Sequence, residues 1–183
     1  MLLQRLFAAR PAQGAGRELY DAAARQARRP EFYRALGAAD TVEGRFELYS
    51  LHVALLLIRL KGQGQIAAAT AQDLFDVYVR ALDDALREMG VSDVKVGKKM
   101  RGLGEAFYAR LKAYEDAVAK LPDDGELRAL LQRTALEERQ GPQPEPLAGY
   151  VARAAAVLAD QKLEDLLEGR VAWPDVMAEQ AHG

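Results

Sequence analysis

The residues best suited to chemistry in this sequence are four cations that stand close together. Lys95, Lys98, Lys99 and Arg101 fall within seven positions with no acid among them, in the stretch VKVGKKMRG. The whole chain has a net charge of only -2, so any attraction to an anionic partner must be local. Two interpretations are open for this basic turn. It is either an ordinary solvated helix face or a docking surface for an acidic protein, ribosomal RNA or anionic lipid headgroups.

A second group of polar residues recurs along the most apolar part of the chain. Arg45, His52 and Arg59 are spaced by seven residues, so they share a narrow strip of the helix expected over residues 41–60. Charges at the border of a core need partners. Three acids are candidate counter-charges: Asp40, Asp73 and Asp76. The alternative is a polar groove that receives a carboxylate or a backbone segment from a client protein.

Little else in the sequence could support catalysis, a metal or a cofactor. The chain has no cysteine, which excludes disulfides, thiolate nucleophiles and cysteine-ligated zinc. A metal site at His52 is not expected, because His182 near the end of the chain is the only other histidine. Ser50 and Ser92 lie in no nucleophile elbow, and GQGQ and GLGEA lack the context of phosphate loops. We therefore expect a protein that is not an enzyme, with no metal and no cofactor.

Helices must position these residues, because apolar residues recur every three or four positions and strand-type alternation is scarce. The pattern predicts helices over residues 17–28, 30–36, 41–60, 65–89, from about 93 to the KLPDDG stop, 124–139 and 147–169. A chain of 183 residues suffices for one well-filled core. The expected fold is all-α, a single compact bundle of about seven helices.

Local signals refine the two helices that carry the polar residues. Asp40 and Glu43 resemble a capping box at the start of the central helix. Gly90 suits a left-handed end for the helix that includes Met89 on its buried face. The next helix has an apolar stripe for the core: Val96, Met100, Leu103, Phe107, Leu111 and Tyr114. The basic turn should therefore project from the opposite face.

The chain divides into three expected parts. Residues 1–16 form an amphipathic segment and linker, residues 17–169 the helical domain, and residues 170–183 a tail in which Trp173 latches onto the body. The longest apolar run covers residues 51–58, far short of the roughly 20 residues that span a bilayer. No signal peptide is evident, so we expect a cytoplasmic protein whose first segment either docks on the body or contacts a membrane surface.

An ordered series of short motifs runs through residues 19–114. It comprises Gln26-Ala27-Arg28 with Pro30, Phe32-Tyr33, Asp40-Thr41, Gly44-Arg45-Phe46, Leu51-His52, LREMGV, Val96-Gly97-Lys98 and Ala106-Phe107-Tyr108. In these motifs the chain resembles the ubiquinol-cytochrome c chaperone family, in particular its bacterial branch. Ser92 and Ala109 stand where the family tends to have glycine. Little of the resemblance lies beyond about residue 120.

The resemblance implies an all-helical, non-catalytic assembly factor for the ubiquinol-cytochrome c reductase complex. It implies that the client is cytochrome b or another reductase subunit. It also implies that the protein is cytoplasmic or peripheral on the inner membrane, and that it does not bind DNA. In the mitochondrial branch it also implies a ribosome contact and a small helper protein. Two other classes stay open: a generic helical interaction or ribosome-binding module, and a helical enzyme, which would need a deep pocket with convergent acids.

Overall fold

The computed structural model describes residues 14–136 and 143–178, which form eight α-helices and no strand. The helices are α1 (Ala15–Ala27), α2 (Pro30–Arg34), α3 (Val42–Leu60), α4 (Gln65–Glu88), α5 (Asp93–Val118), α6 (Gly125–Arg133), α7 (Glu145–Asp160) and α8 (Leu163–Leu167). The predicted all-α bundle is confirmed. Of these described helices, none is long and apolar enough to cross a membrane.

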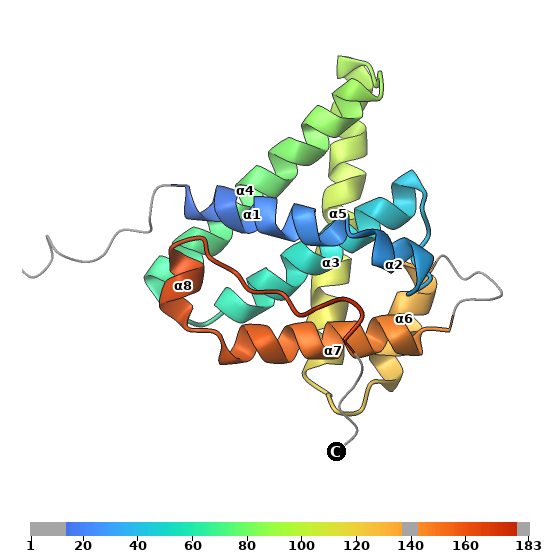
Figure 1. Ribbon diagram of the computed structural model, residues 1–183. Coiled ribbons are helices and arrows are strands. Elements are labelled where there is room, and N and C mark those ends of the chain that lie inside the picture. Colours follow the sequence, from blue (N-terminus) through green and yellow to red (C-terminus); the bar gives the residue numbers. More distant parts are fainter. Residues whose placement is uncertain (1–13, 137–142, 179–183) are drawn as a thin grey trace, which may run out of the picture.

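Helix α3 is the central element of the bundle and packs against α1, α4, α5 and α7 (Figure 1). Leu48, Leu51, Leu55 and Leu56 are all buried, on different sides of the helix. A helix that is apolar on both flanks must be surrounded by others, as the sequence predicted. Its first residue, Val42, is an exception, since 60% of it is exposed.

Helices α4 and α5 form a long hairpin, with lengths of about 36 and 39 Å for their 24 and 26 residues. The ends that meet at Gly90 stand out from the rest of the molecule as an arm (Figure 1). Gly90 has φ 78°, a left-handed conformation that glycine adopts without a steric penalty. It ends α4 as predicted, and we call the end of α4, Gly90 and the start of α5 the hairpin arm.

The cap of α3 differs from the one predicted. The Thr41 hydroxyl, not Asp40, accepts a hydrogen bond from the Gly44 amide at 3.0 Å. The Asp40 carboxylate accepts from Arg45 Nε at 2.8 Å instead. Both Asp40 and Thr41 are good capping residues, so the expectation of a box at Asp40 was wrong by one position.

Two of the predicted helices end earlier than expected. The one predicted over 124–139 ends at Arg133, and part of its second half lies outside the described residues. The one predicted over 147–169 is split into α7 and α8 at Gln161, whose backbone is extended. The Gln161 side chain accepts from the Ala172 amide at 3.0 Å and donates to the Arg170 carbonyl at 2.9 Å. These bonds favour a reversal of the chain over a continuous helix.

After α8 the chain runs back across the molecule between α1 and α7 (Figure 1). Gln26 of α1 donates to the Pro174 carbonyl at 3.3 Å, and Arg153 of α7 donates to the Val176 carbonyl at 3.3 Å. The Trp173 ring packs on His52 with 5.0 Å between centroids. Trp173 therefore fastens this segment to the body as predicted. The segment predicted over residues 1–16 lies almost entirely outside the described residues.

Candidate functional site

The strip of Arg45, His52 and Arg59 crosses three different environments. The three residues do follow one line along α3, but fourteen residues of helix span about 21 Å. Arg45 lines a cavity beside α2, His52 is fully buried, and Arg59 lines a cavity beside α7. The structure thus does not bring the three side chains together in one groove, because the neighbours of α3 change along its length.

Arg45 is an exposed residue paired with Asp40. The Arg45 Nη2 to Asp40 Oδ1 distance is 2.7 Å, and more than half of each side chain is open to water. An exposed ion pair contributes about 1 kcal/mol or less. Asp40 was one of the expected counter-charges. The expected alternative of a buried pair, whose loss would be very costly, was wrong for Arg45.

His52 is the centre of a buried hydrogen-bond network. Its Nδ1 lies 2.7 Å from the Leu48 carbonyl, which can only accept, so Nδ1 carries the proton. Its Nε2 lies 2.8 Å from the Tyr150 hydroxyl, which in turn accepts from Gln26 at 3.1 Å. Burial lowers the pKa of His52 from 6.5 to about 4. His52 is therefore neutral and structural.

Among the described residues, no group of three or more histidine, aspartate or glutamate side chains lies together in a way that could hold a metal ion.

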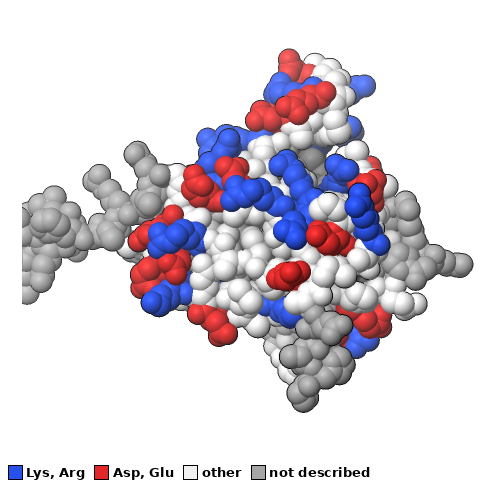
Figure 2. Space-filling view, viewed as in Figure 1, with Lys and Arg blue, Asp and Glu red and all other residues white. Residues whose placement is uncertain are grey.

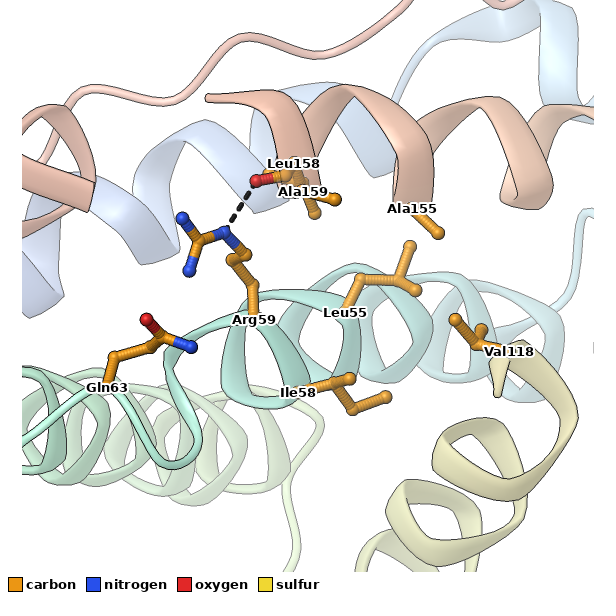
Figure 3. A pocket seen from close by; sticks show the side chains of 8 residues that line it. All are labelled: Leu55, Ile58, Arg59, Gln63, Val118, Ala155, Leu158 and Ala159. Carbon is orange, nitrogen blue, oxygen red and sulfur yellow. Dashed lines mark hydrogen bonds between the residues drawn. The ribbon is translucent and has the colours of Figure 1, made fainter. Parts of the chain in front are cut away.

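Arg59 borders a cavity of about 470 Å³ between α3 and α7, shown in Figure 3. Its Nε donates to the Leu158 carbonyl at 2.7 Å and its Nη2 to the Gln161 carbonyl at 3.1 Å. These are carbonyls that the end of α7 leaves without helical partners, and a cation there also complements the helix dipole. The rest of the cavity is mostly apolar, with Gln63 near the guanidinium (Figure 3). Within the part of the chain that the structure describes, the partners of Arg59 are thus carbonyls and not an acid.

A second cavity, of about 400 Å³, lies between α3, α4 and α5, and Ile58 lines both cavities. Tyr108 lines this second cavity and is 59% exposed, and the centre of its ring lies 5.6 Å from that of Phe75. Lys61 and Glu115 form an ion pair at the edge. We call the following partly exposed residues the apolar surface: Leu57, Ile58, Phe75, Tyr108, Leu111 and Val118.

Sequence reasoning missed this apolar surface. The periodicity correctly put Phe107 and Tyr114 in the core, where both are buried, and assigned Leu111 to the same stripe. Leu111 is only half-buried. Apolar spacing identifies a face of a helix, but it does not show whether another segment covers that face.

The basic turn lies at the start of α5, on the hairpin arm. Lys95, Lys98, Lys99 and Arg101 are all exposed, and none has an ion pair with an acid in the described part of the chain. The nearby Asp93 pairs with Arg87 instead. Acidic and basic side chains stand side by side at the end of the arm (Figure 2). The four cations face water as predicted, and their role in binding stays a prediction.

Apolar groups are also exposed at the arm. Val94 is 92% exposed, and Met89, which was predicted on the buried face of α4, is more than half exposed. That expectation was wrong because the arm extends past the helices that could cover Met89. Gly97, Gly102 and Gly104 face open space, since a Cβ at each would meet no atom within 4 Å. No packing contact among the described residues accounts for these glycines.

A partly buried ion pair between α3 and α5 was also missed. Glu47 is a buried residue, and Arg110 Nε and Nη2 each lie 3.0 Å from one of its carboxylate oxygens. The paired geometry is bidentate, with two parallel N–H to oxygen bonds. An acid inside the most apolar helix was the signal in the sequence that could have revealed this contact.

The comparisons with known proteins decide the family. A family model described as "Ubiquinol-cytochrome C chaperone" matches residues 34–173. The chain belongs to this family. The predicted resemblance is confirmed, but the match extends well beyond residue 120, where the sequence had revealed little. The family is one of chaperones for assembly of the reductase complex.

Relatives of this ubiquinol-cytochrome c chaperone include vertebrate proteins. The ubiquinol-cytochrome-c reductase complex assembly factor 1 of Xenopus laevis is 28% identical over 154 residues, which cover 82% of this chain and 76% of that protein. The Mus musculus and Homo sapiens proteins of that name are 30% identical over 146 residues, covering 78% of this chain. The match spans only 49% and 48% of those two proteins.

A crystal structure of the Cbp3 homolog from Brucella abortus has the same fold. Its TM-score is 0.82 at 31% sequence identity, over 96% of this chain and 98% of that one. The relatives are named as assembly factors and the family as a chaperone, in agreement with the prediction of a protein that is not an enzyme.

Proposed function

We propose that this chaperone binds cytochrome b during assembly of the ubiquinol-cytochrome c reductase complex. Membership of the family supports the complex as the target. The apolar surface is the observation that supports a membrane-inserted subunit as the client. A shallow apolar surface with a polar rim suits an apolar helix, which can bind through side-chain contacts alone and leave again.

Of the predicted client groove, we retain Arg59 as the part that contacts the client. Two N–H groups of Arg59 are engaged by carbonyls of α7, and its remaining N–H groups and Gln63 are left at the cavity. They can donate to a carboxylate or to backbone carbonyls at one end of a bound segment. In this proposal His52 supports α3 from within and does not contact the client.

Changing Tyr108 to glutamate should reduce capture of cytochrome b about tenfold or more. The change removes an aromatic contact with the client. It also introduces a carboxylate that must lose its hydration when the client binds. The measurement is crosslinked capture from respiring cells with the tagged full chain, with bound proteins quantified by mass spectrometry. Met177→Glu is the matched control, because Met177 is 52% exposed and lies in the C-terminal segment. Equal capture by both variants would count against the apolar surface as the client site.

The same capture experiment tests the client itself. Cytochrome b should dominate the crosslinked proteins, and deletion of the gene should lower the amount of assembled reductase complex. A generic interaction module would instead leave the complex at its normal level. Ribosomal proteins as the main crosslinked partners, with an intact reductase, would favour that alternative.

For the basic turn we propose docking on a polyanionic surface close to where the client is made and inserted. The support is the absence of acidic partners for its four cations in the described residues and the exposed position of the arm. Lys95 and Tyr108 are separated by thirteen residues of α5, or about 20 Å. Docking and client binding can therefore occur together.

Neutralising all four residues of the basic turn to glutamine should weaken docking and flatten its dependence on salt. Each lost phosphate contact lowers the slope of log affinity against log salt by about 0.7 to 0.9. The measurement is binding to ribosomes and to anionic vesicles across a salt series. A control variant neutralises four other exposed cations: Arg25, Lys112, Lys120 and Lys162. The same affinity and slope in both variants would show that the basic turn is merely solvated.

A further inference from the structure

A cavity of about 350 Å³ lies between the end of α1, helix α2 and the start of α3. Lys and Arg side chains gather on the face of the molecule over α1 and α2 (Figure 2). We call this cavity the arginine pocket, and its polar lining consists of Arg28, Tyr33, Arg34, Asp40, Arg45 and Tyr49. Neither the client site nor the basic turn includes it.

Two of the three guanidinium groups are held over aromatic rings. The Arg28 Cζ lies 5.5 Å from the centre of the Tyr49 ring, and the Arg45 Cζ lies 5.7 Å from that of Tyr33. The Tyr33 hydroxyl donates to the Ala27 carbonyl at 2.9 Å, which fixes α2 against the end of α1. A guanidinium lying over a ring keeps the N–H groups at its edge for a ligand. Such placement reduces the entropy that binding would otherwise lose.

The charge of the pocket is unbalanced. Asp40 is its one carboxylate and is engaged by Arg45 at 2.7 Å. Arg28 and Arg34 have no ion pair with an acid in the described residues, so three cations and one acid leave a net charge of +2. A carboxylate, with one charge, would compensate half of this. A phosphate monoester carries about -1.5 to -2, and guanidinium groups match phosphate oxygens in geometry.

The exposed side chain of Val42 indicates which kind of molecule carries the phosphate that the pocket would bind. This residue precedes Arg45 by three positions and Tyr49 by seven, so it lies on the same side of α3. It is 60% exposed, and this spacing places it on the side of α3 from which Arg45 and Tyr49 line the pocket. Cations at the headgroups and an aliphatic side chain below them are the combination by which proteins bind anionic membrane surfaces. We propose that the arginine pocket binds the phosphate of phosphatidic acid, an anionic phospholipid whose headgroup is a phosphate monoester, with Val42 entering the apolar layer beneath the headgroups.

The experiment uses the full chain with two kinds of vesicle, phosphatidylcholine alone and phosphatidylcholine mixed with phosphatidic acid. Arg28→Gln/Arg34→Gln should bind the mixed vesicles about tenfold or more weakly than the unchanged protein, because two charged hydrogen-bond donors are lost. Lys112→Gln/Lys162→Gln removes the same net charge at exposed positions outside the pocket and should bind nearly as the unchanged protein does. Equal binding by the two double variants would overturn the proposal.

Further variants show whether the ligand is a membrane lipid or free phosphate. They also distinguish a loss of binding at the pocket from a loss of the fold. Val42→Ser should weaken binding to the mixed vesicles several-fold without changing the affinity for inorganic phosphate. The lipid proposal would be overturned if Val42→Ser bound the vesicles as the unchanged protein does and inorganic phosphate fully displaced the protein from them. The pocket would then be a site for free phosphate. Arg28→Lys/Arg34→Lys keeps the charge but loses the fork of donors, so it should fold and bind with intermediate affinity. Full affinity in this variant would also contradict the proposed pocket.

Discussion

Replacing Arg110 by alanine is expected to lower the free energy of unfolding by about 2 kcal/mol or more. The change removes the ionic partner of the Glu47 carboxylate, whose side chain is 11% exposed when it is paired with Arg110. The two bonds of Arg110 to Glu47 also join α3 to α5, which carry most of the apolar surface. Denaturation by urea, followed by circular dichroism, measures the loss.

Two control variants show whether burial of the unpaired charge causes this loss. Glu47→Leu/Arg110→Leu removes both charges and should be far more stable than the single variant, because well-packed apolar residues can replace a buried pair at little cost. Lys112→Ala breaks the exposed pair with Asp116 and should cost less than about 1 kcal/mol. A similarly small loss for Arg110→Ala would mean that Glu47 reaches water in solution.

Lowering the pH from above 6.5 to near 4 should remove about 3 kcal/mol of stability through His52 alone. Burial lowers the pKa of the folded state to about 4, while the unfolded chain keeps a histidine of about 6.5. Between these values the unfolded state binds more protons than the folded state, so stability falls as the pH falls. The stability is fully present above the unfolded pKa and is lost on the way down to the folded one.

Carboxylates also titrate near the lower end of this range, so the effect of His52 is measured as a difference between variants. Between pH 6.5 and 4, the His52→Gln variant should lose about 3 kcal/mol less stability than the unchanged protein does. His182→Gln changes the chain's other histidine and should keep the profile of the unchanged protein. A pKa near 6.5 for His52, measured by NMR titration, would contradict the network with Leu48 and Tyr150.

The sequence alone determined the helical class, the central position of α3 and the end of α4 at Gly90. Each of these rests on local physics, namely apolar spacing, the helical period and the left-handed conformation that glycine tolerates. The exposed face for the basic turn followed in the same way, because Val96 and Phe107 fixed which side of α5 is buried. The motifs in residues 19–114 were sufficient for the family.

Tertiary structure decided which of these faces are covered. His52 is enclosed because Trp173 and Tyr150 come from distant parts of the chain. Ile58 on the same helix stays partly exposed because no described segment covers it fully. The periodicity of a helix states which residues share a side. Burial, the pKa of a histidine and the existence of a pocket depend on neighbours far away in sequence, whose positions follow only from packing of the whole bundle.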